Sequence, residues 1–202
     1  MLTVQLLDVF YDILSNKKSG IVEINAENGS CHVNIYQGEF VIDLDKSLFM
    51  KVMSDNIKEF SFKESNIDKT FNFYPLLNLL WDFSNLSLSF SDDFYKNYLN
   101  NHIIGKTSLN DIYKLGNQIG IDTLLVYLFF SKSENRTFKD LLDFYSYKSP
   151  QDLKSTVYRL FIIGQLKVLG NIIQENNVQK DNPQLSNKNI ALQKLLNKIS
   201  NL

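Results

Sequence analysis

Residues 20–42 read GIVEINAENGSCHVNIYQGEFVI, and this stretch decides the fold of the first part of the chain. Apolar and polar residues alternate from Cys31 to Tyr36, and a short apolar run lies on each side of that segment. Glu27-Asn28-Gly29-Ser30 and Gln37-Gly38 separate the runs, and the Asn-Gly pair suits the positive φ of a tight hairpin. The pattern therefore predicts three consecutive antiparallel strands.

The segments on either side of these strands complete a small α+β unit. Apolar residues from Val4 to Leu14 fall broadly on one helical face, which predicts an amphipathic helix that ends before Gly20. Lys46 to Ser54 predicts a short second helix, and Glu59 to Lys63 predicts a fourth strand. We therefore expect residues 1–90 to form an α+β domain with an antiparallel sheet.

Aromatic residues are concentrated between positions 71 and 83, where Tyr74 to Phe83 predicts an apolar helix with Pro75 in its first turn. These residues either pack between two halves of the protein or line an exposed groove that binds a partner. Core packing is favoured, because large exposed apolar patches are rare. The candidate partner-binding residues are Phe71, Phe73, Tyr74, Trp81 and Phe83.

From residue 91 onward the pattern changes to helices, and we expect an all-helical, winged-helix-like domain over residues 91–173. The expected helices cover residues 92–100, 108–118, 121–131, 137–144 and 150–163. Thr137 and Ser149 are suited to cap the last two helices, and Gly164 is suited to end the second of them. Residues 165–168 and 170–173 predict a two-stranded wing that turns at Gly170.

The winged-helix layout raises the alternative of a DNA-binding transcription regulator. The helix over residues 150–163 would then be the recognition helix, with the candidate nucleic-acid-binding residues Lys148, Gln151, Lys154, Ser155 and Arg159. The charge of the chain disfavours this alternative, because 21 Lys and Arg residues are balanced by 22 Asp and Glu residues. DNA-binding domains normally show a denser basic footprint.

The C-terminal part consists of a polar linker over residues 174–187 and a last segment over residues 188–202. Six apolar residues of the last segment lie near one helical face: Ile190, Leu192, Leu195, Leu196, Ile199 and Leu202. This pattern predicts an amphipathic helix that docks on another surface, orders only on contact or mediates self-association.

Residues that carry chemistry are sparse, so we expect a protein that is not an enzyme and that has no cofactor or metal. His32 and His102 lie far apart in the sequence, outside any zinc-like spacing. Cys31 is the only cysteine, and on a strand it is best explained as a small core residue. The glycines Gly116 and Gly120 lack the third glycine and the preceding strand of a dinucleotide-binding motif.

The location expected from the sequence is the cytoplasm. A lone cysteine suits a reducing compartment, and the first residues carry no basic leader. The longest apolar stretch, Leu124 to Phe130, is much shorter than the roughly 20 residues that cross a bilayer, so no membrane insertion is expected.

Residues 2–65 resemble the PATAN domain family of bacterial signalling proteins. Residues 6–24 are similar to the opening helix, basic turn, glycine and first strand of that family, and residues 29–42 to its glycine-turn hairpin. Residues 48–53 and 57–62 resemble its closing helix and last strand. Separately, residues 137–168 look like the winged-helix segment that often accompanies such domains.

The resemblance implies a non-enzymatic adaptor in bacterial signalling and regulation. We therefore expect the α+β domain to bind a protein partner, with DNA binding by the winged-helix-like domain as the alternative.

Overall fold

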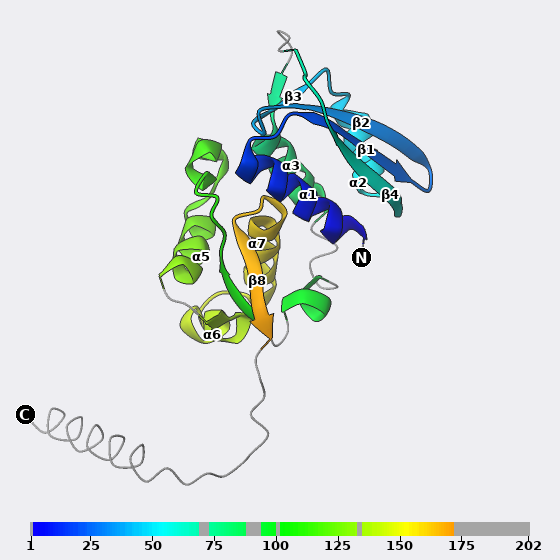
Figure 1. Ribbon diagram of the computed structural model, residues 1–202. Helices are drawn as coiled ribbons and strands as arrows, with labels where there is room; N and C mark the ends of the chain where they lie inside the picture. Colours follow the sequence, from blue (N-terminus) through cyan, green and yellow to red (C-terminus); the bar gives the residue numbers. More distant parts are fainter. Residues whose placement is uncertain (1, 69–72, 88–93, 100–101, 133–134, 172–202) are drawn as a thin grey trace, which may run out of the picture. The chain divides into compact units, whose positions relative to one another are not determined.

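The computed structural model describes residues 2–68, 73–87, 94–99, 102–132 and 135–171 (Figure 1). Residues 1–172 cluster into one unit and residues 173–202 into another. The expected domain boundaries, between residues 90 and 91 and between residues 173 and 174, fall outside the described residues. The expected linker and the amphipathic last segment also lie outside them, so these assignments stay predictions.

A five-stranded antiparallel sheet forms the first part of the fold. Its strands are β1 (Gly20–Ala26), β2 (Gly29–Tyr36), β3 (Phe40–Ile42), β4 (Ile57–Glu64) and β5 (Phe73–Pro75), in the spatial order β4-β1-β2-β3-β5. The predicted meander of three strands is confirmed, and the α+β class with it. The predicted fourth strand pairs with β1 rather than with β3, its neighbour along the chain.

Three helices cover one face of this sheet: α1 (Leu2–Asn16), α2 (Lys46–Met53) and α3 (Leu76–Leu86). Alternate side chains of β1 and β2, such as Val22, Ile24 and Val33, are buried in the same core as residues of these helices. The intervening residues Glu23 and His32 pair across the strands on the opposite, exposed face. The alternation that predicted the strands thus also separates core from solvent.

The first hairpin turn differs from the sequence expectation, whereas the predicted turn at Gln37 and Gly38 is present. Ala26 pairs with Gly29, so Glu27 and Asn28 form the first turn, and neither Asn28 nor Gly29 has a positive φ. The positive φ angles occur in the second turn, at Gln37 (52°) and Gly38 (66°).

The expectation of an all-helical second domain is wrong. Besides α5 (Ile121–Ser131), α6 (Phe138–Phe144) and α7 (Pro150–Ile162), this part contains a three-stranded antiparallel sheet. Its strands are β6 (His102–Lys106), β7 (Arg136–Thr137) and β8 (Leu166–Asn171), in the order β7-β6-β8. Strand β8 continues through Gly170 along β6, so within the described residues no hairpin turns at that glycine. The unpredicted strand β6 pairs with β8 in place of the second strand of the expected wing.

Helix boundaries in the second half follow local chemistry in some places and depart from it in others. The predicted cap Thr137 is confirmed, because it forms a reciprocal capping box with Asp140. The expected helix over residues 108–118 is instead a 3₁₀ helix, η3 (Ile112–Gln118), which Gly116 interrupts with a φ of 53°. Of the expected helix over residues 92–100, the described part shows a short π-helix, η2 (Tyr95–Leu99).

The first sheet and the second half share one hydrophobic core within residues 1–172. The buried cluster includes Phe10 and Val33 from the first part and Leu160 and Ile163 from the second. Polar contacts also join the two parts, since the Tyr11 hydroxyl lies 3.0 Å from the Ser108 hydroxyl. Burial of apolar surface common to both parts therefore stabilises the two together.

Candidate partner-binding surface

The five aromatic residues singled out in the sequence are divided by the structure. Trp81 and Phe83, on α3, are buried in the core. Phe73, on the edge strand β5, is 49% exposed, and its ring stacks edge-on against Phe40 at 4.8 Å. Phe71 lies outside the described residues. Core packing, the interpretation favoured from the sequence, thus applies to Trp81 and Phe83.

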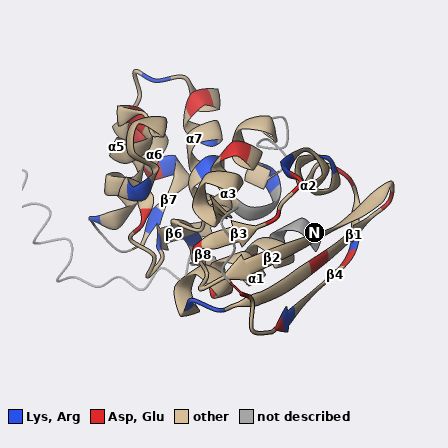
Figure 2. Ribbon diagram, turned by 90° about the horizontal axis from the view of Figure 1, so that it is seen from above, with Lys and Arg blue, Asp and Glu red and all other residues tan. Residues whose placement is uncertain are grey.

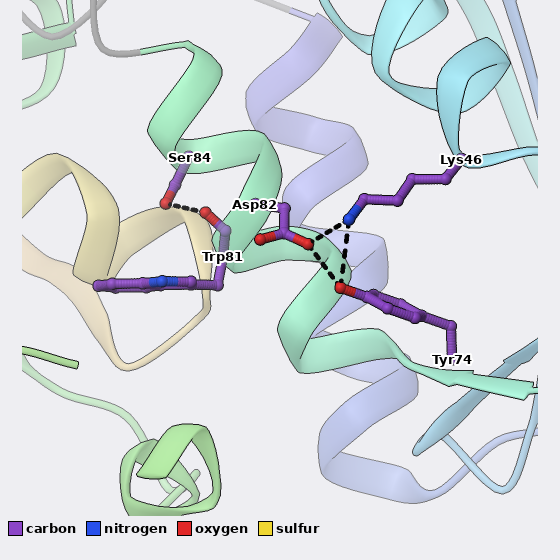
Figure 3. Close-up of polar contacts among 5 residues, drawn as sticks. All are labelled: Lys46, Tyr74, Trp81, Asp82 and Ser84. Atoms are coloured by element: carbon purple, nitrogen blue, oxygen red, sulfur yellow. Dashed lines mark hydrogen bonds and ion pairs between the residues drawn. The ribbon is translucent and has the colours of Figure 1, made fainter. Parts of the chain in front are cut away.

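Tyr74 belongs to a polar cluster with Lys46 and Asp82 (Figure 3). Its hydroxyl donates to Asp82 Oδ2 at 2.5 Å, and Lys46 Nζ donates to the same oxygen at 2.6 Å. Lys46 Nζ also lies 4.9 Å from the centre of the Tyr74 ring. The cluster ties the start of α2 to strand β5 and helix α3, so Tyr74 is held by intramolecular contacts.

Alkaline pH should weaken this cluster. The hydrogen bond to Asp82 raises the pKa of Lys46 above its ordinary value of 10.5. Burial, and to a smaller extent the hydrogen bond to Asp82, raises the pKa of Tyr74 above its ordinary value of 10.0. Both groups hold their protons more tightly when folded, so their stabilisation is complete below those values and is lost as pH rises through the folded pKa values. Urea unfolding of the wild type from about pH 8 to about pH 11 should show this loss.

The matched variant for this prediction is the double substitution Lys46→Met and Tyr74→Phe. Because Lys46 is half exposed, the free energies of unfolding of the double variant and the wild type should differ by about 1 kcal/mol or less at neutral pH. The free energy of unfolding of the double variant should fall less steeply above about pH 10 than that of the wild type. Identical slopes in the two proteins would contradict the assigned contacts.

The candidate nucleic-acid-binding residues are largely engaged with the protein itself. The Arg159 guanidinium lies 5.7 Å from the Trp81 ring, and burial lowers its pKa. Lys154 Nζ lies 4.6 Å from the centre of the Tyr95 ring, and Ser155, like Lys154, is half-buried. Elements before α7 in the chain therefore lie against the side of α7 that a nucleic acid would have to contact.

The remaining two candidates lie near the start of α7. Lys148 forms an ion pair with Asp122 of α5 at 2.5 Å, whereas Gln151 is exposed. Positions of Lys and Arg are interspersed with those of Asp and Glu along the described chain (Figure 2). The structure does not gather the five candidates into one open basic face.

Four of the exposed large apolar side chains in the second half lie on α5, α6 and the loop that follows α6. Ile121 is 69% exposed, Leu128 45%, Phe144 65% and Tyr147 76%. Together with the half-buried Leu125 they form what we call the α5–α6 apolar surface. Ile121, Leu125 and Leu128 are spaced by four and three residues, so they form one row along the helix.

Several contacts link α6 and the segment that follows it to α5. The Tyr145 hydroxyl donates to the Leu125 carbonyl at 3.4 Å, which holds the segment after α6 against α5. The rings of Phe129 and Phe144 lie 5.3 Å apart, so α6 packs on the flank of the exposed row. Lys148, which pairs with Asp122, also lies 5.6 Å from the Tyr147 ring. The ion pair thus anchors Tyr147 beside the row.

The sequence of α5 already contains a signal for this exposed surface. Helix α5 is apolar around most of its circumference between Leu124 and Phe130, whereas a helix at the surface of a protein normally has a polar face. The opposite side of the helix, with Val126 and Phe130, is buried in the core. The row Ile121, Leu125 and Leu128 therefore extends beyond what the core can cover.

Groups suited to catalysis do not converge in the described part of the chain. Burial raises the pKa of the Cys31 thiol to about 11, which makes it a poor nucleophile at neutral pH. His32 follows on the opposite face of β2, away from that thiol. The described residues contain no group of three or more His, Cys, Asp or Glu side chains that could hold a metal ion.

Comparisons with protein-family models, with curated proteins and with solved structures give no match to this chain. In the part of the chain that the structure describes, no helix has both the length and the apolar character to cross a membrane.

Proposed function

We propose that this chain is a non-enzymatic adaptor that binds a protein partner through the α5–α6 apolar surface. The observation that carries the proposal is the exposure of Ile121, Leu128, Phe144 and Tyr147 on elements that contact one another. Contiguous exposed apolar side chains of this size mark interaction sites in globular proteins. The surface replaces the aromatic segment of our sequence analysis as the preferred docking site, because Trp81 and Phe83 are buried.

The composition of the surface suits protein recognition. Phenylalanine and tyrosine are enriched at the energetic centres of protein interfaces, where they bury large areas at a small cost in conformational entropy. The helical spacing of Ile121, Leu125 and Leu128 presents a ridge against which an amphipathic partner helix can pack. The ion pair of Asp122 and Lys148 supplies a polar element beside these apolar anchors.

The regulatory context of the proposal comes from the sequence. The resemblance of residues 2–65 to PATAN domains supports a role in bacterial signalling, and the single buried thiol of Cys31 suits the reducing cytoplasm. DNA binding is less favoured, because Lys148, Lys154 and Arg159 contact protein groups. It is kept as an outcome of the experiment.

Site-specific photocrosslinking in the native cells tests the proposal. A photoreactive phenylalanine analogue at position 147 should capture a protein partner, since Tyr147 is 76% exposed at the proposed surface. The same analogue at position 113 is the matched control, because Tyr113 is 64% exposed but lies on η3. Nuclease treatment before analysis separates protein partners from proteins joined through DNA.

Substitutions at the surface complete this test. Leu128→Ser and Phe144→Ser should each weaken binding of the captured partner by about tenfold or more, because anchor residues of an interface typically contribute over 1 kcal/mol each. Leu48→Ser, on the exposed side of α2, should leave the affinity unchanged. Equal capture at positions 147 and 113, or nuclease-sensitive capture alone, would contradict the proposal.

A further inference from the structure

A cavity of about 360 Å³ lies between α1, α7 and β8, away from the α5–α6 apolar surface. Its walls are mainly apolar and include Leu7, Phe94, Phe161 and Val168. The rings of Phe94 and Phe161 meet edge to face at 5.2 Å. The volume falls within the range of about 300–1,000 Å³ that is typical of small-molecule sites.

Two of the polar groups in the wall are already satisfied by the protein. The Tyr11 hydroxyl is hydrogen-bonded to the Ser108 hydroxyl, and the Thr107 hydroxyl donates to the Gly164 carbonyl at 2.7 Å. Gly164 has a φ of 69°, and a Cβ at this position would lie 3.3 Å from the Tyr11 ring. This wall is therefore a built part of the fold.

Two opposite charges line the same cavity, Asp8 from α1 and Lys167 from β8, and both residues are exposed to solvent. Among the described residues, neither the Asp8 carboxylate nor the Lys167 ammonium group forms a hydrogen bond or an ion pair. The two charges are therefore too far apart to neutralise each other directly. Although Asp8 remains in contact with solvent, partial burial by its neighbours raises the pKa of its carboxyl group. The hydrogen bond to Ser108 lowers the pKa of Tyr11, and the charge of Lys167 adds to this effect.

We propose that this cavity binds a small zwitterion with an apolar body, of the class of the large apolar α-amino acids. The ammonium group of such a ligand pairs with Asp8, its carboxylate pairs with Lys167, and its side chain packs against Phe94 and Phe161. An apolar molecule without charges would fill the cavity but pair with neither protein charge, whereas a zwitterion gains a charge-assisted contact with each. A ligand with one charge would satisfy only one of them.

Titration of the purified full-length chain with three related probes tests the proposal. L-phenylalanine carries both charges, phenethylamine carries only the ammonium group, and 3-phenylpropionate carries only the carboxylate. L-phenylalanine should bind more tightly than either of the other two. Asp8→Asn should weaken L-phenylalanine and phenethylamine by about tenfold, with little effect on 3-phenylpropionate. Lys167→Gln should weaken L-phenylalanine and 3-phenylpropionate by about tenfold, with little effect on phenethylamine.

Matched variants control for the change in net charge. Glu23→Gln alters an exposed acid on the open face of the first sheet, and Lys106→Gln alters an exposed base on β6, the neighbour of β8. Both should leave all three affinities unchanged, and urea unfolding verifies that every variant folds. The proposal is overturned if no probe binds, if a singly charged probe binds as tightly as L-phenylalanine, or if Asp8→Asn and Lys167→Gln have no effect. Because these residues lie outside the α5–α6 apolar surface, the result is independent of the adaptor proposal.

Discussion

Replacing Phe83 with Ala is expected to lower the free energy of unfolding by about 3–5 kcal/mol. The ring is 2% exposed and lies in the core shared by the first sheet and the second half. Its removal loses the transfer free energy of the buried ring and leaves a cavity that the neighbouring side chains only partly fill. The corresponding fall in melting temperature is about 2–4 °C per kcal/mol for a chain of this size.

Phe73→Ala is the matched control for this experiment. Phe73 belongs to the same aromatic segment, but it is half exposed on an edge strand. Its loss removes a cross-strand ring contact with Phe40, which is worth about 1 kcal/mol or less. Equal destabilisation by the two substitutions would contradict the division of the segment into core and surface residues. Urea unfolding monitored by circular dichroism measures both.

Gly38→Ala is expected to lower the free energy of unfolding by about 2–5 kcal/mol, through two causes that add. A φ of 66° is unfavourable for residues with a Cβ and costs about 1–2 kcal/mol. The added Cβ would also lie 2.4 Å from the carbonyl oxygen of Ile13, which is backbone at the end of α1. Relief of this overlap requires a backbone shift, for which overpacking costs of about 1–3 kcal/mol are typical.

The contact that Gly38 permits joins the second hairpin turn to the end of α1. The Gly38 amide donates to the Lys18 carbonyl at 2.8 Å, and the Gln37 amide donates to the Ser19 hydroxyl at 2.8 Å. Disruption of this contact should therefore loosen the packing of α1 against the sheet.

Gly116→Ala separates the two causes. Gly116 also has a positive φ, 53°, but a Cβ at this position would meet no atom within 4 Å. The substitution should therefore carry only a conformational cost, which is about 1–3 kcal/mol for the sparsely populated backbone geometry of Gly116, with its ψ of −128°. If Gly116→Ala destabilised the protein as much as Gly38→Ala, the steric contact with Ile13 would not be the larger contribution at Gly38.

Several elements of the fold were predictable because their signals are local. The alternation from Cys31 to Tyr36 predicted β2, and the period of apolar residues predicted α1, α2 and α5 close to their observed bounds. The cap at Thr137 was predictable from the residue itself, because the capping box closes within three residues of chain. Such features need no information about distant parts of the molecule.

The misassigned elements depend on partners far away in the sequence. Strand β6 (His102–Lys106) has only two large apolar residues, Ile103 and Ile104, and becomes a strand because β7 and β8 pair with its two edges. The expected turn at Gly170 failed for the same reason, since the register with β6 carries β8 through that position. The register of long-range pairing is not encoded in the pattern of a single short strand.

The sequence by itself determined the α+β class, the order of most helices and strands, and the composition from which a binding surface could be made. Only the tertiary structure decided which apolar residues are buried. It places Trp81 and Phe83 in the core and leaves Leu128, Phe144 and Tyr147 exposed. The physical reason is that hydrophobicity is a property of each residue, whereas burial depends on which other surfaces cover it. A partner surface is the apolar area that remains once the core is complete.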